Sequence, residues 1–216
     1  MKLVIGNKNY STWSLRAWLL LSAFEVSFDE VKVSLSVEST AGEIAKYSKA
    51  GKVPVLHDNG MVIWDSLAIC EYVSEQYLEG TGWPAHTEKR AAARSCSAEM
   101  HSSFTVLRSE MPMNCRANNR RVEISPDLQK DISRIDTIWT EMRSKYANDG
   151  PWLFGDFSIA DCMFAPVVFR FATYNAAVSQ ESKEYMESML NHPKMKLWLE
   201  QAKSEVEVIE EDEAGV

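Results

Sequence analysis

The most constraining feature of this sequence is a change of pattern near residue 80. Short apolar or alternating segments, which are typical of strands, occur only before the turn-rich stretch 79–84. After it, the patterned segments repeat at helical spacing. A chain of 216 residues accommodates one large domain or two small ones. We therefore predict an α/β unit over residues 1–80, a linker over 81–87 and an all-helical unit over 88–216.

The first unit has the predicted element order βαβαββα. This order combines a parallel crossover, an antiparallel hairpin and a closing helix, which together make a thioredoxin-like unit of minimal size. The triplet Asp58-Asn59-Gly60 is the hairpin turn signal. Strands are expected at 2–6, 28–35, 53–56 and 61–64, and helices at 14–24, 40–49 and 65–77.

The second unit is predicted to contain helices only. The first is a single long helix over 86–112, ended or kinked at Pro112. Ser125 and Pro126 start the next helix as its N-cap and first-turn residue. Further helices are expected at 158–173, 180–190 and 193–204.

The formal net charge of −8 disfavours a general nucleic-acid binder, which needs a basic surface. Six acidic residues and no basic residue occupy the last thirteen positions, so the rest of the chain carries only −2. We therefore expect a solvated acidic tail and a body that tolerates an anionic ligand.

Cysteine usage and the N-terminal segment favour the cytoplasm. The four cysteines are far apart and form no CxxC motif, which fits reduced thiols better than a disulfide framework. The apolar run at residues 3–5 is too short for a secretory leader, and no window reaches the ~18–20 apolar residues that span a bilayer. The four histidines are scattered, so no metal is implied.

Hydroxyl groups cluster in the loop before the first helix. Ser11, Thr12 and Ser14 lie at the expected N-terminus of that helix. A hydroxyl there can stabilise the thiolate of a bound ligand, as helix N-termini do for protein thiols. The loop contains no cysteine, which argues against disulfide exchange. Simple capping of the helix is the other interpretation.

Val53 and Pro54 begin the third strand next to the hairpin. Thioredoxin-like folds hold a cis proline at this place, which exposes the backbone of the preceding residue for pairing with an extended peptide. Alternatively, Pro54 only starts an edge strand.

Asp65 and Ser66 stand at the start of the helix that closes the first unit. The free N–H groups there can hold a carboxylate, Ser66 adds a hydroxyl, and Asp65 can pair with an ammonium group. Both features suit an α-amino acid group, although plain capping is the simpler interpretation. Ser158 and Asp161 form a capping box, which we interpret as structural.

Taken together, these motifs resemble the cytosolic glutathione transferase superfamily over about residues 2–204. The set comprises the serine-rich loop before Arg16, Lys52-Val53-Pro54, Asp65-Ser66 with Ala68-Ile69, and Ser158-Ile159-Ala160-Asp161. The loop is most similar to the serine-type zeta class. Two positions depart from the zeta pattern, because Trp13 stands where zeta enzymes have cysteine and Asp65 replaces the usual glutamate.

The resemblance implies how glutathione binds as a cosubstrate, with no permanently bound cofactor. Its thiolate faces Ser11, with Ser14 as a second candidate and Thr12 beside it. Its cysteinyl backbone pairs with Val53 at Pro54. Lys52 approaches its carboxylates. Its γ-glutamyl group meets Asp65 and Ser66.

The helical unit is then expected to bind a small hydrophobic or anionic electrophile. Trp13, His101, Arg108 and Met111 are the candidate substrate-binding residues, with His101, Thr105 and Arg108 on one face of the long helix. Arg116 is a further candidate for holding an anionic substrate. A solvated helix face with a core stripe is the other interpretation of this stretch.

The resemblance implies a cytoplasmic homodimer with transferase activity in detoxification. One alternative is glutathione-dependent cis–trans isomerisation, as in maleylacetoacetate isomerase. The other is a non-catalytic glutathione- or ligand-binding module that serves in stress response or assembly. Neither a membrane nor a nucleic acid is expected as a partner.

Overall fold

The computed structural model describes residues 1–146 and 150–215. Its sheet has the strand order β2-β1-β3-β4, in which β1 pairs with β2 in parallel and with β3 in antiparallel orientation, and β3 pairs with β4 in antiparallel orientation. The predicted crossover and hairpin are thereby confirmed. The strands are β1 (Lys2–Ile5), β2 (Asp29–Lys32), β3 (Val55–Asp58) and β4 (Met61–Ile63).

The hairpin between β3 and β4 turns at Asn59 and Gly60. Both residues have positive φ angles, 47° and 79°. A two-residue turn with this backbone matches the twist of the strands it joins, which explains why an Asn-Gly pair stands here. The helices of this unit are α1 (Thr12–Ala23), α2 (Thr40–Ala45) and α3 (Ser66–Tyr77).

The second half is helical, as predicted, but its first helix is not continuous. The chain leaves α4 at Ser102 and enters α5 at Thr105, with Phe104 in the left-handed region at φ 62°. The prediction of one long helix over 86–112 is therefore wrong. The helices are α4 (Thr87–Ser102), α5 (Thr105–Glu110), α6 (Pro126–Tyr146), α7 (Ile159–Tyr174), α8 (Gln180–Asn191) and α9 (Pro193–Ser204).

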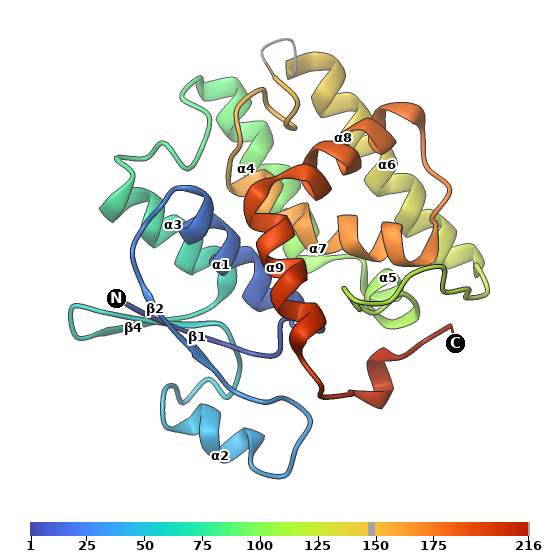
Figure 1. Ribbon diagram of the computed structural model, residues 1–216. Coiled ribbons are helices and arrows are strands. Elements are labelled where there is room, and N and C mark those ends of the chain that lie inside the picture. Colours follow the sequence, from blue (N-terminus) through green and yellow to red (C-terminus); the bar gives the residue numbers. More distant parts are fainter. Residues whose placement is uncertain (147–149, 216) are drawn as a thin grey trace.

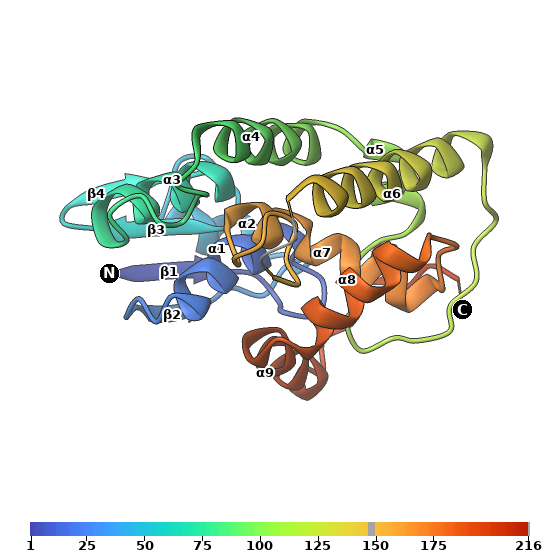
Figure 2. The same ribbon diagram turned by 90° about the horizontal axis from the view of Figure 1, so that it is seen from above.

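Helix α1 joins the two halves of the molecule. It packs against α3 on one side and against α7 and α9 on the other, and each of its residues from Ser14 to Leu21 is buried. This position explains why the helix is apolar nearly all round rather than along one stripe. Figure 2 shows the sheet at one end of the molecule and α5, α6 and α8 at the other, and Figure 1 shows α9 beside α1.

The capping box predicted at the start of α7 is confirmed. The Asp161 carboxylate accepts the backbone N–H of Ser158 at 2.9 Å, and it also accepts hydrogen bonds from the Leu153 N–H and the Tyr185 hydroxyl, both at 3.1 Å. Asp161 is fully buried, so these donors compensate its loss of hydration.

The acidic segment after α9 is not a solvated tail. The side chains of Glu205 and Glu213 are only 6% and 16% exposed. Glu213 accepts hydrogen bonds from the Tyr10 hydroxyl and from Arg120, both at 2.6 Å. The prediction of a free tail is therefore wrong, because these acids have specific partners elsewhere in the fold. Among the helices described here, none combines the length and apolar character that crossing a membrane requires.

Candidate functional site

Two serines at the start of α1 form a hydrogen-bonded pair. The Ser11 hydroxyl donates to the oxygen of Ser14 at 2.7 Å, and that oxygen also accepts the backbone N–H of Gly6 at 3.0 Å. Ser14 is fully buried, and Ser11 is 6% exposed. Space beside Gly6 is also limited, because a Cβ there would lie 2.5 Å from Leu35 Cδ1 and 3.1 Å from the Ser11 oxygen. The two serines therefore differ in their contacts. Ser14 links the first turn of α1 to the end of β1, whereas Ser11 contacts Ser14.

Thr12 has a structural partner from the helical half. Its hydroxyl oxygen accepts a hydrogen bond from Arg170 at 2.9 Å. The other terminal nitrogen of Arg170 donates to the carbonyl oxygens of Arg108, at 3.2 Å, and Met111. The Arg170 guanidinium thus ties the start of α1 to the segment that ends α5. Burial lowers its pKa to about 10, and the positive charge of Arg108 adds to this effect.

The bond between Val53 and Pro54 is cis, as predicted. Val53 is partly exposed and Pro54 is buried, and they lead directly into β3. Lys52, just before them, is exposed. The structure thus leaves the Lys52 and Val53 positions accessible at one edge of the unit.

Asp65 is the N-cap of α3 and has two separate partners. One carboxylate oxygen accepts the backbone N–H groups of Leu67 and Ala68 at 3.0 and 3.2 Å. The other lies 2.9 Å from Nε2 of His101 on α4. The neighbouring Ser66 is fully buried, and its hydroxyl has no hydrogen-bond partner among the residues that the structure describes. Capping and an available hydroxyl therefore occur together at this helix start.

Trp13 contacts two guanidinium groups. The Cζ atoms of Arg16 and Arg108 lie 4.5 and 4.7 Å from the centre of its ring, distances typical of cation–π contacts. The ring of His101 approaches the indole edge-on, with ring centres 5.2 Å apart. His101 in turn contacts Asp65, the N-cap of α3. The fold therefore brings together side chains from α1, α4 and α5 and from the start of α3.

Arg16 belongs to the same group of side chains, although the sequence pattern predicts no binding role for it. Its side chain is fully buried, yet within the described part of the chain none of its three nitrogens has a hydrogen-bond partner. Burial and the positive charges of Arg108 and Arg170 hold its pKa well below the usual value. A buried guanidinium without acceptors is costly, which marks this position as one kept for a reason other than stability. The signal in the sequence is that Arg16 is the one charged residue of α1.

The remaining predictions concern the helical half. The break between α4 and α5 means that His101 and Arg108 do not share one helix face, contrary to the prediction. Met111 is fully buried in the core. Arg116 donates to the carbonyl oxygens of Glu205 and Glu207 at 2.7 and 2.9 Å, so the segment after α9 occupies it.

A cleft of about 790 Å³ lies elsewhere, between the end of α3, the linker, the start of α4 and residues 154–158. None of the site residues predicted above, all of which the structure describes, lines it. The cleft mixes acidic groups of α3 with basic groups of α4, but it lacks the serine pair and the buried guanidinium. We therefore place the candidate site by its chemistry, at the start of α1, rather than by cavity size.

Family models decide the relationship. The model for the N-terminal domain of glutathione S-transferase matches residues 10–76, and the model for the C-terminal domain of glutathione S-transferase matches residues 116–201. The chain belongs to the glutathione S-transferase superfamily. A probable maleylacetoacetate isomerase from Caenorhabditis elegans is 25% identical over 179 residues, which is 79% of this chain and 81% of that protein.

Solved structures of the superfamily share the fold. A glutathione transferase homologue from Burkholderia with bound glutathione superposes with a TM-score of 0.72 at 22% identity, covering 94% of this chain and 98% of that one. A bacterial zeta-class maleylpyruvate isomerase gives a TM-score of 0.70 at 20% identity, with 94% and 96% covered. These likenesses confirm the predicted thioredoxin-like unit followed by a helical unit.

Proposed function

We propose that this superfamily member is an enzyme that binds glutathione as a cosubstrate and activates its thiolate for attack on a small electrophile. The observation that carries the proposal is the hydrogen-bonded pair of serines at the start of α1, the helix whose first turns also carry Arg16, a buried guanidinium with no hydrogen-bond partner among the described residues. A hydroxyl and a positive field at one place stabilise a developing thiolate.

Ser14 supports Ser11 in this proposal. The oxygen of Ser14 accepts the backbone N–H of Gly6, and this hydrogen bond fixes the position of the Ser14 hydroxyl. A hydroxyl rotates to suit its neighbours, so Ser14 can donate to Ser11 while Ser11 donates to the sulfur of glutathione. The thiolate is then stabilised by a donor that is itself held in place.

The rest of glutathione is assigned to the edge formed by β3 and α3. The accessible backbone of Val53 pairs with the cysteinyl unit, and the exposed Lys52 lies near a carboxylate. The γ-glutamyl group meets the start of α3, where Asp65 supplies negative charge and Ser66 a buried, unused hydroxyl. In this proposal residues 1–80 bind glutathione and residues 88–216 face the electrophile.

The electrophile side is assigned to Trp13, His101 and Arg108. The indole supplies an apolar face. The Arg108 guanidinium, which also donates to the carbonyl oxygens of Ser103, at 3.2 Å, and Met100, adds positive charge that favours a substrate with negative charge. Met111 supports this side from the core. The similarity to a probable maleylacetoacetate isomerase favours a second reaction at the same site, reversible addition of the thiolate with cis–trans isomerisation.

A homodimer is also part of the proposal. β4 and the residue after it expose Met61, Val62 and Trp64, with exposed fractions of 44%, 38% and 56%. Apolar groups gathered on one strand favour burial against another protein surface. A Val62→Glu variant is expected to shift the sedimentation coefficient toward that of a monomer. A wild-type protein that sediments as a monomer at micromolar concentration would contradict this part.

Substitution of the two serines tests the catalytic assignment. Ser11→Ala should lower turnover of a chloronitrobenzene or of maleylacetone at least about tenfold and raise the thiol pKa of bound glutathione. Ser14→Ala should lower turnover less, because it removes a support rather than the donor. An unchanged thiol pKa in Ser11→Ala, or equal losses for both variants, would refute the choice of Ser11.

A further inference from the structure

We propose that Glu205 is a positioning residue for the reaction, which it serves by fixing the loop that carries Ser11. This inference rests on the proposed function of Ser11. Glu205 lies directly after α9 and is nearly 200 positions away in the sequence from the loop it contacts.

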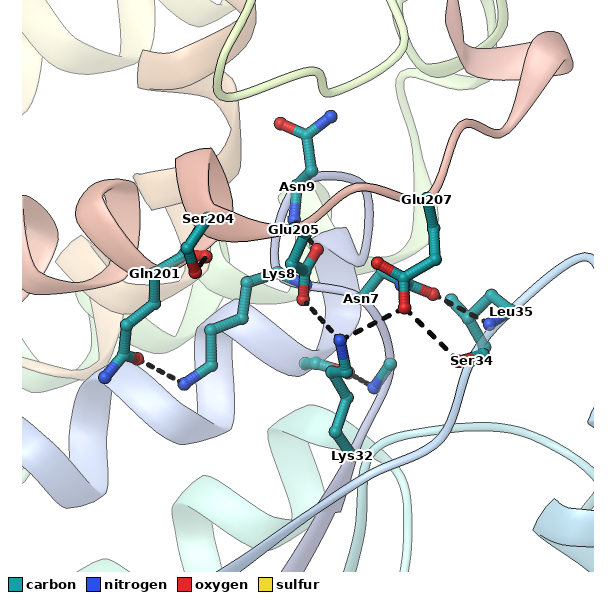
Figure 3. A network of polar contacts seen from close by, with 12 residues as sticks. Asn7, Lys8, Asn9, Lys32, Ser34, Leu35, Gln201, Ser204, Glu205 and Glu207 are labelled. Carbon is teal, nitrogen blue, oxygen red and sulfur yellow. Dashed lines mark hydrogen bonds and ion pairs between the residues drawn. The ribbon is translucent and has the colours of Figure 1, made fainter.

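The contact is a carboxylate bound by two consecutive backbone amides. One oxygen of Glu205 accepts the N–H of Lys8 at 2.8 Å, and the other accepts the N–H of Asn9 at 3.0 Å. Lys8 and Asn9 are 4% and 0% exposed, so water cannot replace this acceptor without a change in the fold. Figure 3 shows Glu205 between the backbone of this loop and the side chain of Lys32.

Glu205 is itself held firmly. Its backbone carbonyl accepts a hydrogen bond from Arg116 at 2.7 Å, and its carboxylate lies 3.5 Å from the Lys32 ammonium group. α9, which it follows, packs on α1. The carboxylate therefore meets the loop from a rigid support, which is what positioning requires.

The opposite face of the loop is held by the segment after α5. The carbonyl oxygen of Asn9 accepts the N–H of Cys115 at 3.1 Å, and its side-chain oxygen accepts the N–H of Arg116 at 2.8 Å. The amide nitrogen of Asn9 donates to the side chain of Asn114 at 2.9 Å. These bonds use the other polar groups of Asn9, so the two consecutive N–H groups are left to Glu205.

The turn that Glu205 fixes ends at Ser11. The backbone N–H of Ser11 donates to the carbonyl oxygen of Asn7 at 2.8 Å, which closes the turn over Lys8 and Asn9. Loss of the carboxylate leaves two buried donors without an acceptor, and the turn must move to reach water. A small displacement of the Ser11 hydroxyl weakens its hydrogen bond to the thiolate, because that bond depends steeply on distance and angle.

Substitution of Glu205 provides the test. Glu205→Gln keeps one acceptor oxygen but turns an NH₂ group toward an N–H, and Glu205→Ala removes both acceptors. We expect kcat to fall about threefold in the first and about tenfold in the second, with the KM for glutathione unchanged within about twofold. The thiol pKa of bound glutathione, read from thiolate absorbance, should rise in the same order. A residue that merely stabilised the fold would not move that pKa.

Glu207→Gln is the matched control. It removes the same charge from the same segment and a contact with the same Lys32, at 3.2 Å, but its carboxylate contacts Ser34 rather than the loop amides. We expect wild-type kcat and thiol pKa. Equal losses in the Glu207 and Glu205 variants would overturn the inference in favour of a simple charge effect.

The double variant Ser11→Ala/Glu205→Gln shows whether Glu205 acts through Ser11. The double variant should be no slower than Ser11→Ala alone, because the group that Glu205 positions is gone. Additive losses would overturn the inference. If Ser11→Ala raises the thiol pKa and neither Glu205 variant does, only the inference fails. If Ser11→Ala itself leaves the pKa unchanged, the proposed function fails as well.

Discussion

Two buried arginines in this protein should respond to the same substitution with opposite signs. Arg16 and Arg170 are both almost completely shielded from solvent. The guanidinium of Arg170 donates to two carbonyl oxygens and to Thr12, whereas that of Arg16 has no acceptor within the described residues. Methionine has a similar length and no charge, so Arg→Met isolates the cost or benefit of the guanidinium.

The magnitudes follow from these contacts. Replacing buried charge by an apolar group of similar volume often stabilises a protein by about 1–4 kcal/mol, from which the stack on Trp13 subtracts about 0.5–1 kcal/mol. Arg16→Met should therefore raise the free energy of unfolding by about 0–3 kcal/mol, or Tm by up to roughly 12 °C. Arg170→Met leaves three acceptors unsatisfied at about 1–3 kcal/mol each and should destabilise by at least about 3 kcal/mol.

Urea and thermal unfolding of both variants without ligand measure this difference. If Arg16 is kept for an anionic ligand, a fixed glutathione concentration should also raise the Tm of Arg16→Met less than that of the wild type. A loss of more than about 1 kcal/mol in ligand-free Arg16→Met would refute the reasoning, because it would show that the guanidinium stabilises the fold.

Three further outcomes follow from the contacts described. Asp65→Ala should lose about 0.5–2 kcal/mol of stability with its cap, whereas Asp65→Asn keeps a capping oxygen and should weaken glutathione binding with little loss of stability, as unfolding and titration calorimetry will show. Asp161→Asn offers one acceptor oxygen to the donors around Asp161 and should destabilise by about 2–4 kcal/mol in urea. Burial opposes ionisation of Glu213, but the hydrogen bond from Tyr10 and the charge of Arg120 hold its pKa below the usual 4.5. The stability it contributes is therefore present above pH 4.5 and lost as the pH falls through the lowered pKa, and the urea midpoint of Glu213→Gln should fall less steeply with acidification than that of the wild type.

Local sequence patterns predict most of the fold. The order of strands and helices, the Asn59-Gly60 turn and the cis bond before Pro54 each have a signature within a few neighbouring residues. The break before α5 has none, because Phe104 takes up a left-handed conformation without a glycine or proline nearby. Phe104 is buried in the core, and such tertiary packing is not visible in a helical repeat.

The site was predictable to the extent that single motifs define it. The serine loop and the start of α3 were found because hydroxyl and carboxylate groups at helix N-termini have a recognisable spacing. A hydrogen bond from Gly6 distinguishes Ser14 from Ser11, and burial makes Arg16 conspicuous, but neither follows from composition. The acidic segment was misjudged for the same reason, since its partners Tyr10 and Arg120 are distant in the sequence.

The two hydrogen bonds between Glu205 and the loop that precedes Ser11 also have a consequence for the order in which the protein folds during synthesis. A ribosome completes the whole sheet and α3 long before it adds Glu205 and Glu213. Domains generally begin to fold as they emerge, so the α/β unit can form its strands while the two amides of the loop still lack their acceptor. A stalled chain that ends before residue 205 would then have its strands in place, while the backbone amides of Lys8 and Asn9 still lack the acceptor that fixes them in the complete fold.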